Sequence, residues 1–113
     1  CWLLGTEPVN VWAQLRRAQE ISPEVESQAD MLLSFSSGIT ASVHLDYLRP
    51  AYHRSVEIMG PVDAQRYDMG PNDAGGENYT AELQAFLDGA PLCTGREALA
   101  ALRIVELAKE CAA

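Results

Sequence analysis

The spacing of the apolar residues changes halfway along the chain, and this change limits the folds that the chain can adopt. In residues 9–15 (VNVWAQL) apolar residues recur at every second position, as in a strand with one buried face. The same alternation returns in residues 29–35, 39–48 and 53–59, and more weakly in 64–69 (AQRYDM). From residue 77 onward the apolar residues recur every three or four positions instead. We therefore expect strands first and helices after them.

Two amphipathic helices are predicted in the second half of the chain. The first covers residues 77–88 and is followed by Gly89, since glycine is favoured just past a helix end. Its apolar face consists of Tyr79, Leu83, Phe86 and Leu87. The second helix begins near Thr94 and Glu97, which have the spacing of a capping box. Its predicted buried stripe consists of Leu99, Leu102, Val105 and Ala108.

These elements predict an α+β fold. We expect one domain over residues 1–113, with a mainly antiparallel sheet of four to six strands, two C-terminal helices on one face and the other face open. The number of strands after residue 60 is left open. Trp12 falls on the polar side of its strand, where it is either capped by another chain or packed at a rim.

The register of the central hairpin follows from its apolar pattern. A two-residue loop at Ser37 and Gly38 would join the apolar face of one strand to the polar face of the other. A three-residue loop over residues 36–38 keeps the faces together and puts Gly38 where a bulge needs a positive φ. The three-residue loop predicts the pairs Phe35–Ile39, Leu33–Ala41, Met31–Val43 and Ala29–Leu45.

Continuing the same faces into the next strand predicts a meander, with residues 48–53 (LRPAYH) as the connection and Leu45 near Val56. Val43 would then lie near Ile58. On the polar face this arrangement predicts a row of Asp30, His44 and Glu57. The row is either a proton-handling or hydroxyl-binding contact or a solvated charge ladder. In both cases two carboxylates would favour a protonated His44.

Charge and cysteine content exclude several classes of partner. Sixteen acidic and eight basic residues give a formal charge of -8, so nucleic acid and anionic membranes would repel the chain. No apolar run approaches the ~20 residues that span a bilayer. The three cysteines lack CxxC spacing, which argues against a disulfide framework or a zinc site and favours the cytoplasm.

Sequence motifs for catalysis or cofactor binding are missing from the printed sequence. It contains no GxGxxG, GxxxxGK[ST], GxSxG or HExxH pattern. His44 and His53 have no second ligand at helical spacing, so we predict no metal site. We likewise assign no catalytic and no cofactor-binding residue to this chain. A self-contained hydrolase is disfavoured because the sequence shows no recognisable pair of nucleophile and general base.

Four short segments, in this order, carry a family resemblance. They are WLLG (2–5), SG (37–38), RSVEIMG (54–60) and GREALAALRIVE (95–106). Together they resemble the C-terminal domain of the Gfo/Idh/MocA family of NAD(P)-dependent sugar and polyol oxidoreductases. The stretch from residue 67 to residue 77 looks shorter than the sheet extension usual in that family.

The resemblance implies a division of labour with a second domain. In the family a Rossmann domain with a glycine-rich loop and a catalytic lysine comes first, and a catalytic histidine lies on the helix that ends in WLLG. All of these would precede Cys1, so we expect a C-terminal domain truncated at its N-terminus. Such a chain binds no cofactor itself, while the full-length parent would use NAD or NADP.

By resemblance, the chain would wall the substrate pocket and form a homo-oligomer through its open sheet face. The substrate-binding candidates are His44, Asp46 and Tyr52, and the interface candidates are Trp12, Leu32, His44, Leu48 and Met59. The alternative is a self-contained small α+β binding or dimerisation module without catalysis.

Overall fold

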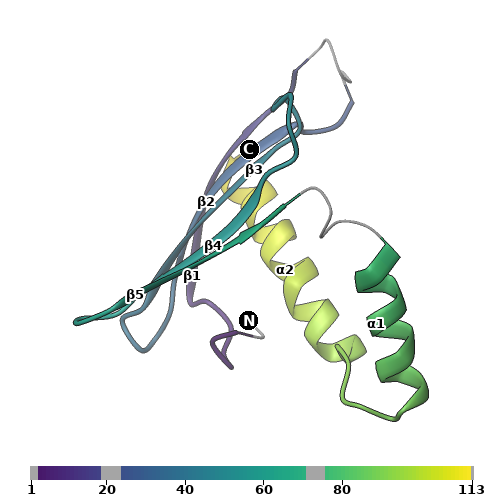
Figure 1. The fold of residues 1–113 in the computed structure, drawn as a ribbon. Coiled ribbons are helices and arrows are strands. Elements are labelled where there is room, and N and C mark those ends of the chain that lie inside the picture. The colour runs from purple at the N-terminus through teal and green to yellow at the C-terminus, as the bar shows by residue number, and fades with distance from the viewer. Residues whose placement is uncertain (1–2, 19–23, 71–75, 113) are drawn as a thin grey trace. The chain divides into compact units, whose positions relative to one another are not determined.

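A computed structural model describes residues 3–18, 24–70 and 76–112 of the chain (Figure 1). The chain divides into two compact units, the first formed by Cys1–Leu48 with Cys93–Ala113 and the second by Arg49–Leu92. The first unit contains strands β1 (Asn10–Arg16), β2 (Gln28–Ser34) and β3 (Thr40–Asp46) with helix α2 (Gly95–Ala112). The second contains β4 (Arg54–Met59), β5 (Ala64–Met69) and helix α1 (Gly76–Leu87). All strand pairs are antiparallel, so the predicted α+β class is confirmed.

The β2–β3 hairpin has the predicted register. Leu33 lies opposite Ala41, Met31 opposite Val43, and the remaining pairs follow in step. The Phe35 N–H donates to the Ile39 carbonyl at 2.9 Å, which closes the three-residue loop. Gly38 has a φ of 84°, a conformation that costs a residue with a Cβ about 1–2 kcal/mol. The loop therefore selects one register and penalises the neighbouring one.

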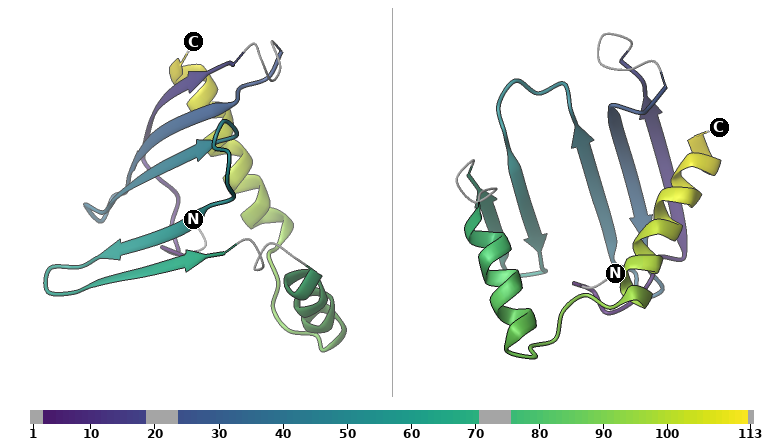
Figure 2. Two further views of the ribbon diagram at one scale, coloured as in Figure 1. Left: turned by 45° about the horizontal axis from the view of Figure 1, so that its top comes forward. Right: turned by 90° about the vertical axis from the view of Figure 1, so that its right-hand side faces the viewer.

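One face of the β1–β2–β3 sheet is apolar, and α2 packs on its β1 side. Its cross-strand rows are Val11–Leu33–Ala41, Ala13–Met31–Val43 and Leu15–Ala29–Leu45. Figure 2 shows α2 running along this sheet on the side of β1, the strand with which it is in contact. Ala13 and Leu33 are buried on the sheet, and Ala100 and Ala108 are buried on the helix. The core of the first unit lies in this layer.

The buried stripe of α2 differs from the predicted one. Ala100 and Ala108 are buried and Ile104 is half-buried, whereas Leu99, Leu102 and Val105 are exposed. Residues 100, 104 and 108 are four apart and therefore form one row along the helix. The short alanine side chains let the helix backbone approach the sheet closely, which the bulkier leucines would prevent. Of the predicted stripe, Ala108 is therefore confirmed as buried, and the burial predicted for Leu99, Leu102 and Val105 is wrong.

The second unit contains a two-stranded sheet in which β4 pairs with β5, with Val56 opposite Tyr67 and Ile58 opposite Gln65. The predicted pairing of residues 54–59 with β3 would join the two units, and it stays a prediction. The β4–β5 loop spans only residues 60–63 and is closed by a 2.7 Å hydrogen bond from the Gly60 N–H to the Asp63 carbonyl. A longer link, residues 47–53 with Pro50 in it, separates β3 from β4.

Helix α1 ends as its sequence predicts. Gly89 has a φ of 69° and donates to the Phe86 carbonyl at 3.2 Å, and Ala90 donates to the Ala85 carbonyl at 2.9 Å. These bonds satisfy carbonyls that the helix end leaves without partners. The predicted apolar residues of α1 are exposed: Tyr79, Leu83, Phe86 and Leu87.

A capping box begins α2, as predicted. The Glu97 carboxylate accepts hydrogen bonds from the Thr94 N–H and hydroxyl, each at 2.7 Å, and the Glu97 N–H donates back to Thr94 Oγ1 at 3.3 Å. The bond from the Thr94 backbone is the main cause that lowers the pKa of Glu97 below its ordinary value, and the hydroxyl bond adds to it. The capping box therefore favours the ionised carboxylate.

We expect Ala108→Leu to lower the free energy of unfolding by about 1–3 kcal/mol, because Ala108 is 2% exposed and a larger side chain would push α2 away from β1. Ala101→Leu, at an exposed position of the same helix, is the control and should change stability by less than about 0.5 kcal/mol. Urea denaturation followed by circular dichroism measures both. Equal effects of the two substitutions would contradict the packing of α2.

The capping box also predicts an acid dependence. Since the pKa of Glu97 is lower in the folded chain than in the unfolded one, its stabilisation is present above the unfolded value and is lost as pH falls through the folded value. Glu97→Gln keeps a capping-box side chain but does not titrate. Urea midpoints measured between about pH 6 and about pH 3 should fall less steeply for this variant than for the original chain. Glu106→Gln, an exposed change elsewhere on α2, should keep the original slope.

Candidate functional site

The face of the β1–β2–β3 sheet opposite to α2 is the candidate site, and we call it the open face. It consists of the cross-strand rows Asn10–Ser34–Thr40, Trp12–Leu32–Ser42, Gln14–Asp30–His44 and Arg16–Gln28–Asp46. These rows follow from the alternation of side chains along each strand. Trp12 is 56% exposed and Leu32, directly opposite, is 48% exposed. The open face thus carries an apolar row between polar ones.

Beside the apolar row, Asp30 and His44 form a close pair. The Asp30 carboxylate Oδ1 lies 2.6 Å from His44 Nδ1, and both side chains are 57% exposed. The two residues are directly opposite each other on β2 and β3, as the three-residue loop predicts. An ionised carboxylate can only accept, so this bond requires the proton to be on Nδ1.

Asp46 lies on the other side of the imidazole. Its Oδ2 is 3.9 Å from His44 Nε2, while its Oδ1 accepts a 2.6 Å hydrogen bond from the Leu48 N–H. This second bond holds the carboxylate at the end of β3, the edge strand of the sheet. His44 therefore has a carboxylate near each ring nitrogen, and the site can donate and accept hydrogen bonds within one small area.

The structure brings together some of the predicted site residues and assigns others to the second unit. His44 and Asp46 share the open face with Trp12 and Leu32, and Leu48 lies two residues after the end of β3. Tyr52 and Met59 belong to the second unit. The predicted place of Glu57 beside His44 depends on a β3–β4 pairing between the two units, and it stays a prediction. Glu57 lies opposite Arg66 in the β4–β5 sheet.

The arrangement around His44 suits hydrogen bonding more than metal binding. Its two nitrogens are directed to different carboxylates, so the three side chains share no common centre. Within residues 3–18, 24–70 and 76–112, no group of three or more His, Cys, Asp and Glu side chains is placed to hold a metal ion. Cys93 and Cys111 are free and exposed, and Cys1 lies outside the described residues.

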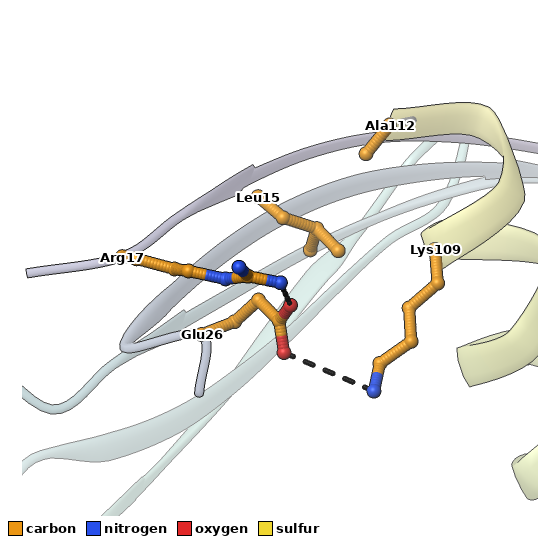
Figure 3. A pocket seen from close by; sticks show the side chains of 5 residues that line it. All are labelled: Leu15, Arg17, Glu26, Lys109 and Ala112. Carbon is orange, nitrogen blue, oxygen red and sulfur yellow. Dashed lines mark hydrogen bonds and ion pairs between the residues drawn. The ribbon is translucent and has the colours of Figure 1, made fainter. Parts of the chain in front are cut away.

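A second charged cluster, which the sequence analysis missed, joins the β1–β2 connection to the last turn of α2. Glu26 lies 2.9 Å from Arg17 and 3.8 Å from Lys109 (Figure 3). The hydrogen bond from Arg17 is the main cause that lowers the pKa of Glu26, and Lys109 adds an attraction. With Leu15 and Ala112 these residues line an open hollow. No local motif signals the cluster, because Lys109 is distant from Glu26 in the sequence.

Comparison with known proteins identifies the family of the chain. The sequence model of the GFO/IDH/MocA C-terminal domain matches residues 1–61, which is more than half of the chain and includes β1 to β4. The chain belongs to this family. A search of curated proteins and a search of solved structures each found no match. The resemblance inferred from the four short segments is therefore confirmed at the level of the family.

Among the described residues, no helix is long and apolar enough to cross a membrane. In the segment WLLG (2–5), which contributed to the resemblance, Trp2 lies outside the described residues. Leu3 to Gly5 form a turn in which Gly5 has a φ of 65°.

Proposed function

We propose that this chain is the C-terminal domain of an NAD(P)-dependent oxidoreductase that acts on a sugar or a polyol. Its own role is to wall the substrate pocket and to pair subunits through the open face. The match to a C-terminal domain of the GFO/IDH/MocA family is the observation that carries the proposal. The exposed Trp12 and Leu32 support the interface role, because apolar side chains gathered in one patch are typical of surfaces that another chain covers.

The proposal divides the chemistry between two domains. A dinucleotide-binding domain would hold the nicotinamide and supply the groups that assist hydride and proton transfer. The present chain has no glycine-rich dinucleotide motif, so its side chains would contact substrate and partner instead. We place the enzyme in the cytoplasm, in keeping with free cysteines.

Substrate contact is proposed for His44 and Asp46, with Tyr52 from the second unit as a further candidate. A sugar presents several hydroxyl groups, each of which donates and accepts hydrogen bonds. The imidazole and carboxylates at the β3 edge offer both functions within one area. The Trp12–Leu32 row beside them would contact a second copy of the chain, and His44 would lie both in this interface and at the border of the substrate site.

The division of labour predicts that the isolated chain neither binds NAD(H) or NADP(H) nor reduces them with any sugar. Isothermal calorimetry with NADH and NADPH should give no binding heat, with an intact two-domain dehydrogenase as the positive control. A micromolar Kd for the isolated chain would contradict the proposal.

The reading frame upstream of Cys1 distinguishes the proposal from a self-contained module. A glycine-rich strand–turn–helix encoded there would support the dehydrogenase. A stop codon followed by a start site would favour the module.

The interface role predicts that the chain dimerises through the open face. Leu32→Asp puts a charge into the apolar row and should abolish the dimer, because an unpaired charge is costly to bury. Leu102→Asp, at an exposed position of α2, is the control and should leave the dimer intact. Analytical ultracentrifugation measures both. A monomer of the original chain at high concentration would contradict this role.

A further inference from the structure

The charges on the open face differ from those of the chain as a whole. The chain has a formal charge of -8 with histidine neutral. The four rows of the open face, in contrast, include one cation, Arg16, and two carboxylates, Asp30 and Asp46, together with His44. The other members of these rows carry no charge. The net charge of the open face is therefore set by the protonation of one imidazole.

The net charge of the open face affects how strongly two copies of the chain repel each other. A strongly acidic chain repels a second copy over most of its surface. On the open face, a protonated His44 and Arg16 cancel the two carboxylates, so that a second copy meets a neutral surface with an apolar row beside the charges. With a neutral His44 each face has one net negative charge. In a two-fold dimer the same patch of both copies lies in the interface, so both copies contribute this charge.

We propose that protonation of His44 strengthens the pairing of two copies of this chain through the open face, so that the dimer weakens as pH rises. The proposal rests on the proposed function, which assigns subunit pairing to this face. Imidazole groups gain or lose their charge between about pH 5 and about pH 8. The dimer is stronger below this titration and weaker above it.

The groups that face His44 support the proposal. From β2, Asp30 contacts Nδ1 at 2.6 Å, and on β3 itself Asp46 lies 3.9 Å from Nε2. From β1, the uncharged Gln14 lies in the same cross-strand row, and Arg16 lies in the neighbouring row with Asp46. Helix α2 packs on the opposite face of the sheet. The carboxylates favour the imidazolium, and dimerisation in turn favours it because the neutral form leaves negative charge in the interface.

The test measures the dimer Kd by sedimentation equilibrium at about pH 5.5 and about pH 7.5, at fixed salt, where imidazole changes its charge. We expect the Kd of the original chain to rise about tenfold or more over this range. His44→Gln should give a weaker dimer whose Kd does not change with pH. His53→Gln is the matched control, because His53 is the other histidine of the chain and is not part of the open face. This variant should keep the original pH dependence.

A further variant tests the direction in which the dimer Kd changes with pH. In Asp30→Asn the open face carries one net positive charge at low pH and none at high pH, so its dimer should no longer weaken as pH rises. A dimer of the original chain with a constant Kd would overturn the proposal, as would His44→Gln or Asp30→Asn with the original pH dependence. These outcomes leave the interface itself standing. If the original chain is monomeric at both pH values, or if Leu32→Asp leaves the dimer intact, the proposed interface fails as well.

Discussion

The register of the β2–β3 hairpin is the constraint on which the rest of the first unit depends. The three-residue loop, with Gly38 in the left-handed region, places Leu33 against Ala41 and Asp30 against His44. A slip by one residue would exchange the faces of β3, turning its polar series toward α2 and its apolar series outward. The carboxylate–imidazole pair and the place of His44 and Asp46 beside the Trp12–Leu32 row follow from this alignment.

Local patterns in the sequence predict much of this arrangement. Alternation located the strands, the Ser36–Gly38 loop fixed the register, and short-range signals at Thr94 and Gly89 located helix ends, because each of these depends on residues a few positions apart. The open-face candidates His44 and Asp46 followed from the same pattern. Their use in binding remains a prediction.

Features that depend on distant residues were not predicted. The burial of Ala100 on α2 and the exposure of Leu99 and Leu102 follow from how closely helix and sheet approach. Glu26 joins Arg17 to Lys109 across a long separation in the sequence.

The functional account depends on which side chains share the open face, so the register is its most direct test. Asp30–His44 and Leu32–Ser42 are expected to be non-hydrogen-bonded pairs, since the hydrogen-bonded pairs begin at Phe35–Ile39 and alternate along the hairpin. In such pairs the two Hα atoms lie close together. Nuclear Overhauser spectra of the labelled chain should show Hα–Hα contacts for both pairs. A contact between Leu33 and Ser42 in their place would mean a two-residue loop and would contradict the account.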